Sequence, residues 1–550
     1  MFCYQCEQTA KGYACTDRGI CGKDPDTAAL QDLLVHAAKG VSMYAHRAAE
    51  LGAHDKEVDV FVMEALFTTV TNVNFDPERC ADLCRNAVVV REKAKMLYEN
   101  AYKQAGKPPE PINGPTTWQP ENDLDGLIRQ GRSVSILNRI DNQGATVTGL
   151  EELLIYGIKG IAAYADHAYI LGYEDQRVYD FIHKAMDYVT KKDNTVDDLL
   201  AMNLACGECA VWTLELLDKA NTDVYGTPEP TQVLMGHKKG KAILVSGHDL
   251  KDLEELLKQT EGKGIHVYTH GEMLPCHGYP ELKKYPHLAG HFGGAWMKQR
   301  KEFDEFPGPI LMTTNCIQEP KDSYKDRIFT CGLVAWPGVT HISNRDFTPL
   351  IESALASPGF EEDSPEKYNW AGFGHQAVLG AADKIVEAVQ AGAIKHFFVI
   401  GGCDGAEPGR NYFTEVAEQM PQDTVLLTMG CGKFRVLDVE MGEIGGIPRR
   451  LDLGQCNDSY SAVKIAMALA DAFGTDVNGL PLSLVVSWFE QKAVCVLLAL
   501  LHLGVKDIRL GPNLPAFITP DVLNVLVEKF NIQPIGESAE ADVKQMLGTA

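Results

Sequence analysis

Four cysteines lie close together at the start of the chain, where they could bind a small metal centre. They are Cys3, Cys6, Cys15 and Cys21, in the spacing C-x2-C-x8-C-x5-C. Four thiolates bind two-iron and four-iron sulfur clusters, and they also bind zinc in a tetrahedron. The spacing favours an iron–sulfur cluster, with zinc as the alternative and disulfide bonds as the third reading.

A second set of possible ligands lies where short aliphatic runs end. Cys316, Cys403 and Cys431 close the runs GPILMTTNC, HFFVIGGC and TVLLTMGC. Each therefore lies at the predicted carboxyl end of a strand, where open α/β sheets bind ligands. Four more residues hold similar positions: His248 in VSGHDLKDLEEL, Glu272 in YTHGEMLP, Cys456 in LGQCNDSY and Glu490 in SWFEQKA.

The composition of this second set indicates its chemistry. Each residue alone is better explained as a core cysteine, a helix cap or a solvated side chain, but seven at one edge are not. If two α/β domains face each other, four soft thiolates, one imidazole and two hard carboxylates converge on one cavity. This mixture favours iron in a cluster of sulfide and oxide over zinc, which is satisfied by four ligands.

The elements that must position these residues are of two kinds. The segments 30–52 and 150–172 align at a constant offset of 120 positions, which Phe61 and Phe181 also keep. Both segments carry apolar residues at i, i+3, i+4 and i+7, the pattern of an amphipathic helix. The first part of the chain is therefore predicted to be two duplicated helical bundles.

After about Pro228, β-branched and aliphatic runs alternate with helical stretches and end at glycine-containing turns. This is the βαβ rhythm of parallel sheets covered by helices. The fold class expected is therefore multidomain α and α/β, with duplicated helical bundles followed by two Rossmann-like domains with mostly parallel sheets. The expected domains are residues 1–226, 227–368 and 369–550.

The overall composition excludes some classes of function. The 550-residue chain has a formal net charge of −24, which argues against nucleic acid or an anionic membrane as a partner. Its longest apolar run, Ala493 to Leu503, is shorter than the roughly 20 residues of a membrane helix. Cys3 and Cys6 lie where a signal peptide would be basic, and fifteen cysteines form no even disulfide framework. We therefore expect a cytoplasmic protein.

The motifs SGHDLKDL, YTHGEMLP, TTNC, GGCDG, GQCNDSYS and WFEQKA resemble those of the hybrid-cluster (prismane) protein family. They follow the same order over essentially the whole chain. The resemblance implies a [4Fe-4S] cubane on the N-terminal cysteines, as in the family branch with this shorter spacing. It also implies a hybrid [4Fe-2O-2S] cluster between the α/β domains, with a persulfide position at Cys403. The implied ligands of the hybrid cluster are His248, Glu272, Cys316, Cys403, Cys431, Cys456 and Glu490.

The resemblance further implies a hydroxylamine reductase, which forms ammonia and water from hydroxylamine with two electrons and two protons. Nitric oxide is the alternative substrate, and an electron-donor protein is required. The residues expected to act in catalysis are Glu272, Cys403, Glu490 and Lys492. A nickel–iron carbon monoxide dehydrogenase is a rival that the two carboxylates disfavour. A nitrosative-stress sensor or NO-transferring protein is another, suggested by Cys403 and the surplus cysteines.

Several cysteines fall outside both sets. Cys206 and Cys209 form a CxxC in the helical part, and Cys80 and Cys84 lie four apart on an expected helix. We interpret these pairs as core residues, with a redox pair or half a metal site as the alternative. Cys276 and the neighbouring His277 follow Glu272 closely and could line the same cavity.

Overall fold

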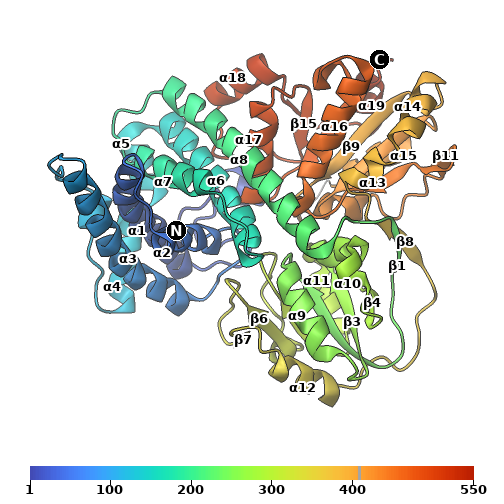
Figure 1. Ribbon diagram of the computed structural model, residues 1–550, viewed down its shortest axis with the longest axis horizontal. Helices are drawn as coiled ribbons and strands as arrows, with labels where there is room; N and C mark the ends of the chain where they lie inside the picture. Colours follow the sequence, from blue (N-terminus) through green and yellow to red (C-terminus); the bar gives the residue numbers. More distant parts are fainter. Residues whose placement is uncertain (407–409, 550) are drawn as a thin grey trace.

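The computed structural model describes residues 1–406 and 410–549. Figure 1 shows a group of helices in blue to green, a first α/β unit in green to olive, and a second α/β unit in orange to red. The long helix α8 (Val196–Tyr225) runs from the helical group towards the region where the three parts meet (Figure 1).

The helical part is built from two similar sets of helices. The first set is α1 (Pro25–Ala49), α2 (Lys56–Thr68) and α3 (Pro77–Gln104), and the second is α6 (Ala145–Ile170), α7 (Gln176–Tyr188) and α8. Asp55 caps α2 and Asp175 caps α7 by accepting hydrogen bonds from backbone amides of the first turn. The short helices α4 (Leu124–Ser133) and α5 (Ile136–Gln143) connect the two sets.

The first α/β unit contains a six-stranded parallel sheet in the order β4-β3-β2-β5-β6-β7. This is the order of the doubly wound dinucleotide-binding fold, in which the sequence runs outward from the centre in both directions. Its strands are β2 (Lys241–Ser246), β3 (Ile265–His270), β4 (Leu288–His291), β5 (Ile310–Met312), β6 (Ile328–Cys331) and β7 (Thr340–Ile342). The accompanying helices are α9 (Leu250–Thr260), α10 (Pro280–Lys283), α11 (Gln299–Glu305) and α12 (Thr348–Ala356).

The second α/β unit repeats this order of strands as β13-β10-β9-β14-β15-β16, again with every pair parallel. Its strands are β9 (His396–Gly402), β10 (Thr424–Met429), β13 (Arg450–Asp452), β14 (Leu482–Ser487), β15 (Ile508–Gly511) and β16 (Gln533–Pro534). Its helices are α13 (His375–Leu379), α14 (Ala382–Gln390), α15 (Asn411–Gln419), α16 (Tyr460–Phe473), α17 (Gln491–His502), α18 (Pro520–Phe530) and α19 (Ala539–Met546).

The predicted fold class is confirmed, because helices are followed by two parallel α/β sheets. Two antiparallel pairs complete the architecture: β1 (Thr231–Leu234) with β8 (Tyr368–Ala371), and β11 (Glu443–Ile444) with β12 (Ile447–Pro448). The β1–β8 pair joins the start of the first α/β unit to the segment that leads into the second. Strand β8 therefore spans the expected boundary between residues 368 and 369.

The apolar run from Ala493 to Leu503 forms most of α17, which packs against α6 and α8. These three helices contribute to the largest hydrophobic core, which joins the helical part to the second sheet. Among the described residues, α8 is the one helix whose length and composition would suffice to cross a membrane, although 44% of its most apolar window is buried inside the protein. Its packing is that of a core helix.

Matching glycines of the two helical sets allow close backbone approach. A Cβ atom on Gly40 would lie 2.5 Å from the carbonyl oxygen of Pro115. A Cβ atom on Gly160 would lie 2.5 Å from the Gln491 carbonyl oxygen and equally close to the Cys495 Cβ. Gly160 therefore sets how closely α6 approaches the first turn of α17.

We expect Gly160→Ala to reduce the free energy of unfolding by about 1–3 kcal/mol, because the added methyl group must push α6 and α17 apart. Glu208→Ala, on the exposed face of α8, is the control and should change stability by less than about 0.5 kcal/mol. Thermal unfolding of the two variants measures the difference. Equal unfolding temperatures would show that the helices separate without cost.

Candidate metal centres

The carboxyl ends of the first sheet carry three of the expected donors. His248 follows β2, Glu272 follows β3 and Cys316 follows β5. The strand order reverses between β2 and β5, which opens the crevice where such sheets bind ligands. Asp249 accepts hydrogen bonds from the first amides of α9, so helix capping holds the loop that carries His248.

The second sheet presents the other four donors in the same way. Cys403 follows β9 and Glu490 follows β14, the two strands beside the reversal of order. Cys431 follows β10 and Cys456 follows β13. The sharp turn before Cys403 requires glycine, because Gly402 has a φ of +108° and a Cβ there would lie 2.1 Å from the Ser487 carbonyl oxygen.

The structure brings all seven donors together between the two sheets. Donor atoms of His248, Glu272 and Cys456 lie within 4.8 Å of one another, and the Cys456 amide donates to the Glu272 carboxylate at 2.8 Å. Cys403 Sγ lies 3.9 Å from Glu490 Oε1. The thiols of Cys316 and Cys431 are hydrogen-bonded to each other and belong to one buried cluster with Cys403. The first sheet thus supplies three donors and the second four to a single buried site.

A threonine of the TTNC motif orients His248. Its hydroxyl oxygen, Thr314 Oγ1, accepts a hydrogen bond from the His248 amide at 2.9 Å and lies 3.1 Å from Nδ1. Nε2 is then the ring nitrogen that faces Glu272, at 3.8 Å from Oε2. Metal-binding imidazoles are usually held through their other nitrogen in this manner. The motif signalled this residue, but sequence reasoning gave Thr314 no role.

Two polar atoms of the site have no hydrogen-bond partner among the described residues: Glu272 Oε1 and Lys492 Nζ. Both side chains are fully buried. The Lys492 ammonium lies 5.7 Å from the centre of the Tyr164 ring, which sequence reasoning did not single out. Burial lowers the pKa of Lys492, but the negative charges of Cys456 and Glu490 outweigh it, so this pKa lies above its ordinary value.

The buried acids and thiols of the site favour their neutral forms when nothing else compensates their charge. Burial raises the pKa of the Cys403 and Cys456 thiols well above the ordinary value. Burial also raises the pKa of Glu272 and of Glu490, against the opposing charges of Lys433 and Lys492. A multivalent cationic centre is the partner that such a set of soft and hard donors fits.

The four N-terminal cysteines also share one small cavity. The backbones of Cys3 and Cys15 are joined by reciprocal hydrogen bonds of 3.1 and 2.8 Å. Burial raises the pKa of the Cys6 thiol well above its ordinary value, and negative charge on the other three thiols raises it further. Burial raises the pKa of the Cys3 thiol to about 11. This arrangement can hold a compact centre with four thiolate ligands. Cys6 also packs with Cys403 and Phe489, so the two cysteine sites are neighbours.

An apolar cavity of about 620 Å³ leads to the second site. It reaches Tyr164, Cys403 and Cys456, and most of the remaining lining comes from α16, α17 and the strands β9, β10 and β14. Such a lining admits small uncharged molecules and disfavours hydrated ions.

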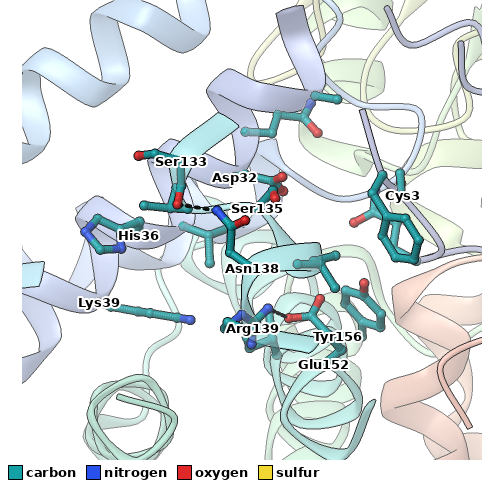
Figure 2. Close-up of a pocket in the computed structure, with 18 of the residues that line it drawn as sticks. Cys3, Asp32, His36, Lys39, Ser133, Ser135, Asn138, Arg139, Glu152 and Tyr156 are labelled. Carbon is teal, nitrogen blue, oxygen red and sulfur yellow. Dashed lines mark hydrogen bonds and ion pairs between the residues drawn. The ribbon is translucent and has the colours of Figure 1, made fainter. Parts of the chain in front are cut away.

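A polar pocket of about 290 Å³ lies beside the N-terminal cysteines (Figure 2). Cys3 lines one side, and Asp32, Lys39, Arg139 and Glu152 line the rest. Figure 2 shows Lys39 extending toward Arg139, which pairs with Glu152. Lys39 has no hydrogen bond within the described residues, and burial, with help from the Arg139 charge, lowers its pKa to about 8. Lys39 and Lys159, which the 120-position offset of the helical repeat relates, both line this pocket.

The remaining cysteines are free and buried. Cys80, Cys84, Cys206 and Cys209 lie in the largest hydrophobic core, and Cys276 lies in the core of the first α/β unit. His277 is held by Thr269 through a hydrogen bond of 3.0 Å. These contacts place Cys276 and His277 in the interior packing of the first α/β unit.

The chain matches the profile of the Prismane/CO dehydrogenase family over residues 1–544. The protein belongs to this family. The resemblance inferred from its motifs is therefore confirmed.

Relatives in the Prismane/CO dehydrogenase family cover the full chain. A hydroxylamine reductase of Rhodospirillum rubrum is 60% identical over 98% of both chains. Those of Geobacter sulfurreducens and Methanocella arvoryzae are 57% and 56% identical over all of this chain and all of their own.

Solved structures show the same fold at much lower identity. A nickel-free carbon monoxide dehydrogenase of Thermococcus sp. AM4 has a TM-score of 0.55 at 17% identity, over 99% of this chain and 90% of its own. Carbon monoxide dehydrogenase IV of Carboxydothermus hydrogenoformans has a TM-score of 0.54 at 15% identity, over 97% of this chain and 89% of its own.

We expect Lys39→Met to stabilise the protein by about 1–3 kcal/mol at neutral pH, because it removes a buried ammonium whose charging costs roughly 1.4 kcal/mol per pKa unit. The folded-state pKa is depressed, so the folded protein binds fewer protons than the unfolded chain between about 8 and 10.5. Lys39 therefore destabilises the folded protein fully below this pH window, and the destabilisation decreases as the pH rises through it. Calorimetry should therefore show that the difference in the free energy of unfolding between the variant and the wild type is smaller at about pH 10 than at pH 7. A gap that is independent of pH would contradict this reading.

Proposed function

We propose that this protein is a hydroxylamine reductase: an iron–sulfur oxidoreductase that converts hydroxylamine, two electrons and two protons into ammonia and water. The observation that carries the proposal is the meeting of soft and hard donors from two sheets in one closed site, with His248, Glu272 and Cys456 within 4.8 Å. The identity of 56–60% to hydroxylamine reductases over at least 98% of the chain supports it.

The proposed metal ligands fall into two sets. Cys3, Cys6, Cys15 and Cys21 hold a [4Fe-4S] cluster. A hybrid [4Fe-2O-2S] cluster is held by His248, Glu272, Cys316, Cys403, Cys431, Cys456 and Glu490. The raised thiol and carboxyl pKa values support both assignments, because each set needs a cation to keep its ligands ionised. Cys403, in the GGCD turn, is the proposed persulfide position.

A cluster held by these seven residues would supply the electrons and the Lewis-acid iron needed to weaken the N–O bond of the substrate. The protein must then deliver protons to a leaving hydroxide and to the amine. Lys492 is the proposed donor, because its ammonium is buried in the site and has no hydrogen-bond partner among the residues that the structure describes. A fixed positive charge there also stabilises the anion that develops on the leaving oxygen.

Glu490 and Glu272 are the two carboxylates proposed to bind metal or to pass a proton. Glu490 accepts hydrogen bonds from the first amides of α17, so its carboxylate is fixed beside Cys403 and close to the Lys492 backbone. Glu272 Oε2 is held by the Cys456 amide, while Oε1 has no hydrogen-bond partner within residues 1–406 and 410–549. One carboxylate oxygen is thus anchored and the other is available to bind metal or to pass a proton.

Substrate and electrons are proposed to enter by different routes. The apolar cavity suits hydroxylamine, which is uncharged at neutral pH, and it suits nitric oxide equally well. Electrons come from a donor protein at the N-terminal centre, where Cys3 and Cys21 are partly exposed. The free state of all fifteen cysteines fits a cytoplasmic location, where thiols stay reduced.

The rival functions fit the site less well. Carboxylates at Glu272 and Glu490 favour an oxygen-containing iron centre over the nickel–sulfide centre of a carbon monoxide dehydrogenase. Cys403 is only 5% exposed, so the thiol of another protein cannot reach it for NO transfer. A stress sensor that works by direct thiol exchange is therefore disfavoured.

The metal content tests the proposal directly. Protein purified without oxygen should contain about eight irons in two spectroscopically distinct clusters, no stoichiometric nickel, and hydroxylamine reductase activity with reduced viologen as electron source. Stoichiometric nickel, a zinc-filled N-terminus, or four irons or fewer would sink the assignment.

Lys492→Met should lower kcat for hydroxylamine by roughly 10²- to 10⁴-fold while leaving the iron content unchanged, because it removes the proton donor but no proposed ligand. Lys241→Met is the matched control. Lys241 begins β2, at the opposite end of that strand from the site, and donates to the Ser357 carbonyl. Steady-state kinetics should separate the two variants. A Lys492→Met enzyme with normal kcat would assign proton delivery to another group.

A further inference from the structure

A buried ion-pair network links the two cysteine sites through residues that are not ligands. Arg410 forms ion pairs with Glu7 and with Asp404, and all three side chains are at most 1% exposed. Glu7 directly follows Cys6, and Asp404 directly follows Cys403. A single guanidinium therefore bridges the loop of the N-terminal centre and the turn of the second centre.

Both carboxylates are held at each of their oxygens. Glu7 Oε1 accepts a hydrogen bond of 2.7 Å from Asn513, while Oε2 pairs with Arg410. Asp404 uses Oδ1 for Arg410 and Oδ2 for Arg435. A planar guanidinium has donors in fixed directions, so it can span two carboxylates in a way that a lysine ammonium cannot. The network thus fixes the relative orientation of the two carboxylates as well as compensating their charge.

Backbone and aromatic contacts surround the same junction. The Glu7 amide donates to the Phe489 carbonyl at 3.0 Å, one residue before Glu490. The Trp296 indole donates to the Asp404 carbonyl at 2.8 Å, and its ring packs on Phe489 with centroids 4.6 Å apart. Cys6, Cys403 and these two rings belong to one buried cluster. The junction is therefore buried and tightly packed.

Stability alone does not explain such a network. Burying ions costs several kcal/mol each, and apolar replacements of buried ion networks are often as stable or more so. Buried charge is best explained where a particular geometry matters. Here the geometry is the separation of two redox centres, and the rate of electron transfer falls steeply with that separation.

We propose that Arg410 is a positioning residue that fixes the Cys6 loop against the Cys403 turn and so maintains electron transfer between the two centres. The inference rests on the proposed function. In the step concerned, the reduced N-terminal centre loses one electron and the second centre gains it, and the external reductant then restores the first.

The test compares Arg410→Lys with Arg509→Lys in the anaerobic holoenzyme. Arg509 is a nearly buried arginine on β15 that pairs with Asp542 at 3.0 Å, outside both cysteine sites. Dithionite reduction is followed by rapid freezing and electron paramagnetic resonance, which report each centre separately. We expect Arg410→Lys to keep both centres and the normal reduction rate of the first, while the second is reduced roughly ten- to hundredfold more slowly. The kcat for hydroxylamine should fall with it, and KM should not change.

Arg509→Lys should behave as wild type in every one of these measurements. Reduction of the second centre at the wild-type rate in Arg410→Lys would overturn the proposal. If Arg410→Lys does not assemble both centres, Glu7→Gln replaces it, because this change keeps the size of the side chain and removes one charge of the bridge. Slower transfer in Glu7→Gln supports the proposal, and an unchanged rate overturns it. Wild-type protein without two iron centres would instead contradict the proposed function.

Discussion

The burial of many ionisable donors in one closed site is the constraint on which the rest of this structure depends. Four thiols, two carboxyl groups, an imidazole and a lysine are almost completely removed from water between the two sheets. Unpaired charges in such a place cost several kcal/mol each, and the raised thiol pKa values express that cost. A metal cluster removes it, because every donor then gains a cationic partner.

The two α/β units use the same arrangement of strands to position the donors of this site. Both sheets have the same strand order, and each places its donors at the carboxyl ends of strands, two of them on the strands that flank the point where that order reverses. Facing crevices then enclose a volume that neither sheet could close alone. The helical part completes the enclosure, since α6 supplies Tyr164 beside Lys492 and, through Gly160, sets the position of α17.

Much of this arrangement was predictable from the sequence, because strand ends are encoded locally. The aliphatic runs before Cys316, Cys403 and Cys431, with the turns that follow them, predicted positions at the carboxyl ends of strands. The structure places Cys316 at that end of the first sheet and Cys403 and Cys431 at that end of the second, in one buried cluster. The helical repeat was equally visible from its periodicity. That the seven residues act as metal ligands stays a prediction, which the family membership supports.

Contacts between distant segments were not predictable, because no local pattern encodes them. Arg410 pairs with Glu7, which lies 403 positions away in the chain, and no sequence pattern around either residue indicates the other. The pocket around Lys39 forms only when α1, α5 and α6 come together. Thr314 lay within a recognised motif, but its role depends on the position of the His248 ring.

Diffraction from anaerobically grown crystals at the iron absorption edge tests the central claim most directly. We expect two groups of iron atoms, one enclosed by Cys3, Cys6, Cys15 and Cys21, and the other in bonding contact with His248, Glu272, Glu490 and the four cysteines of the α/β units. A single iron group, or a second group that leaves the carboxylates and the imidazole unbound, would contradict it.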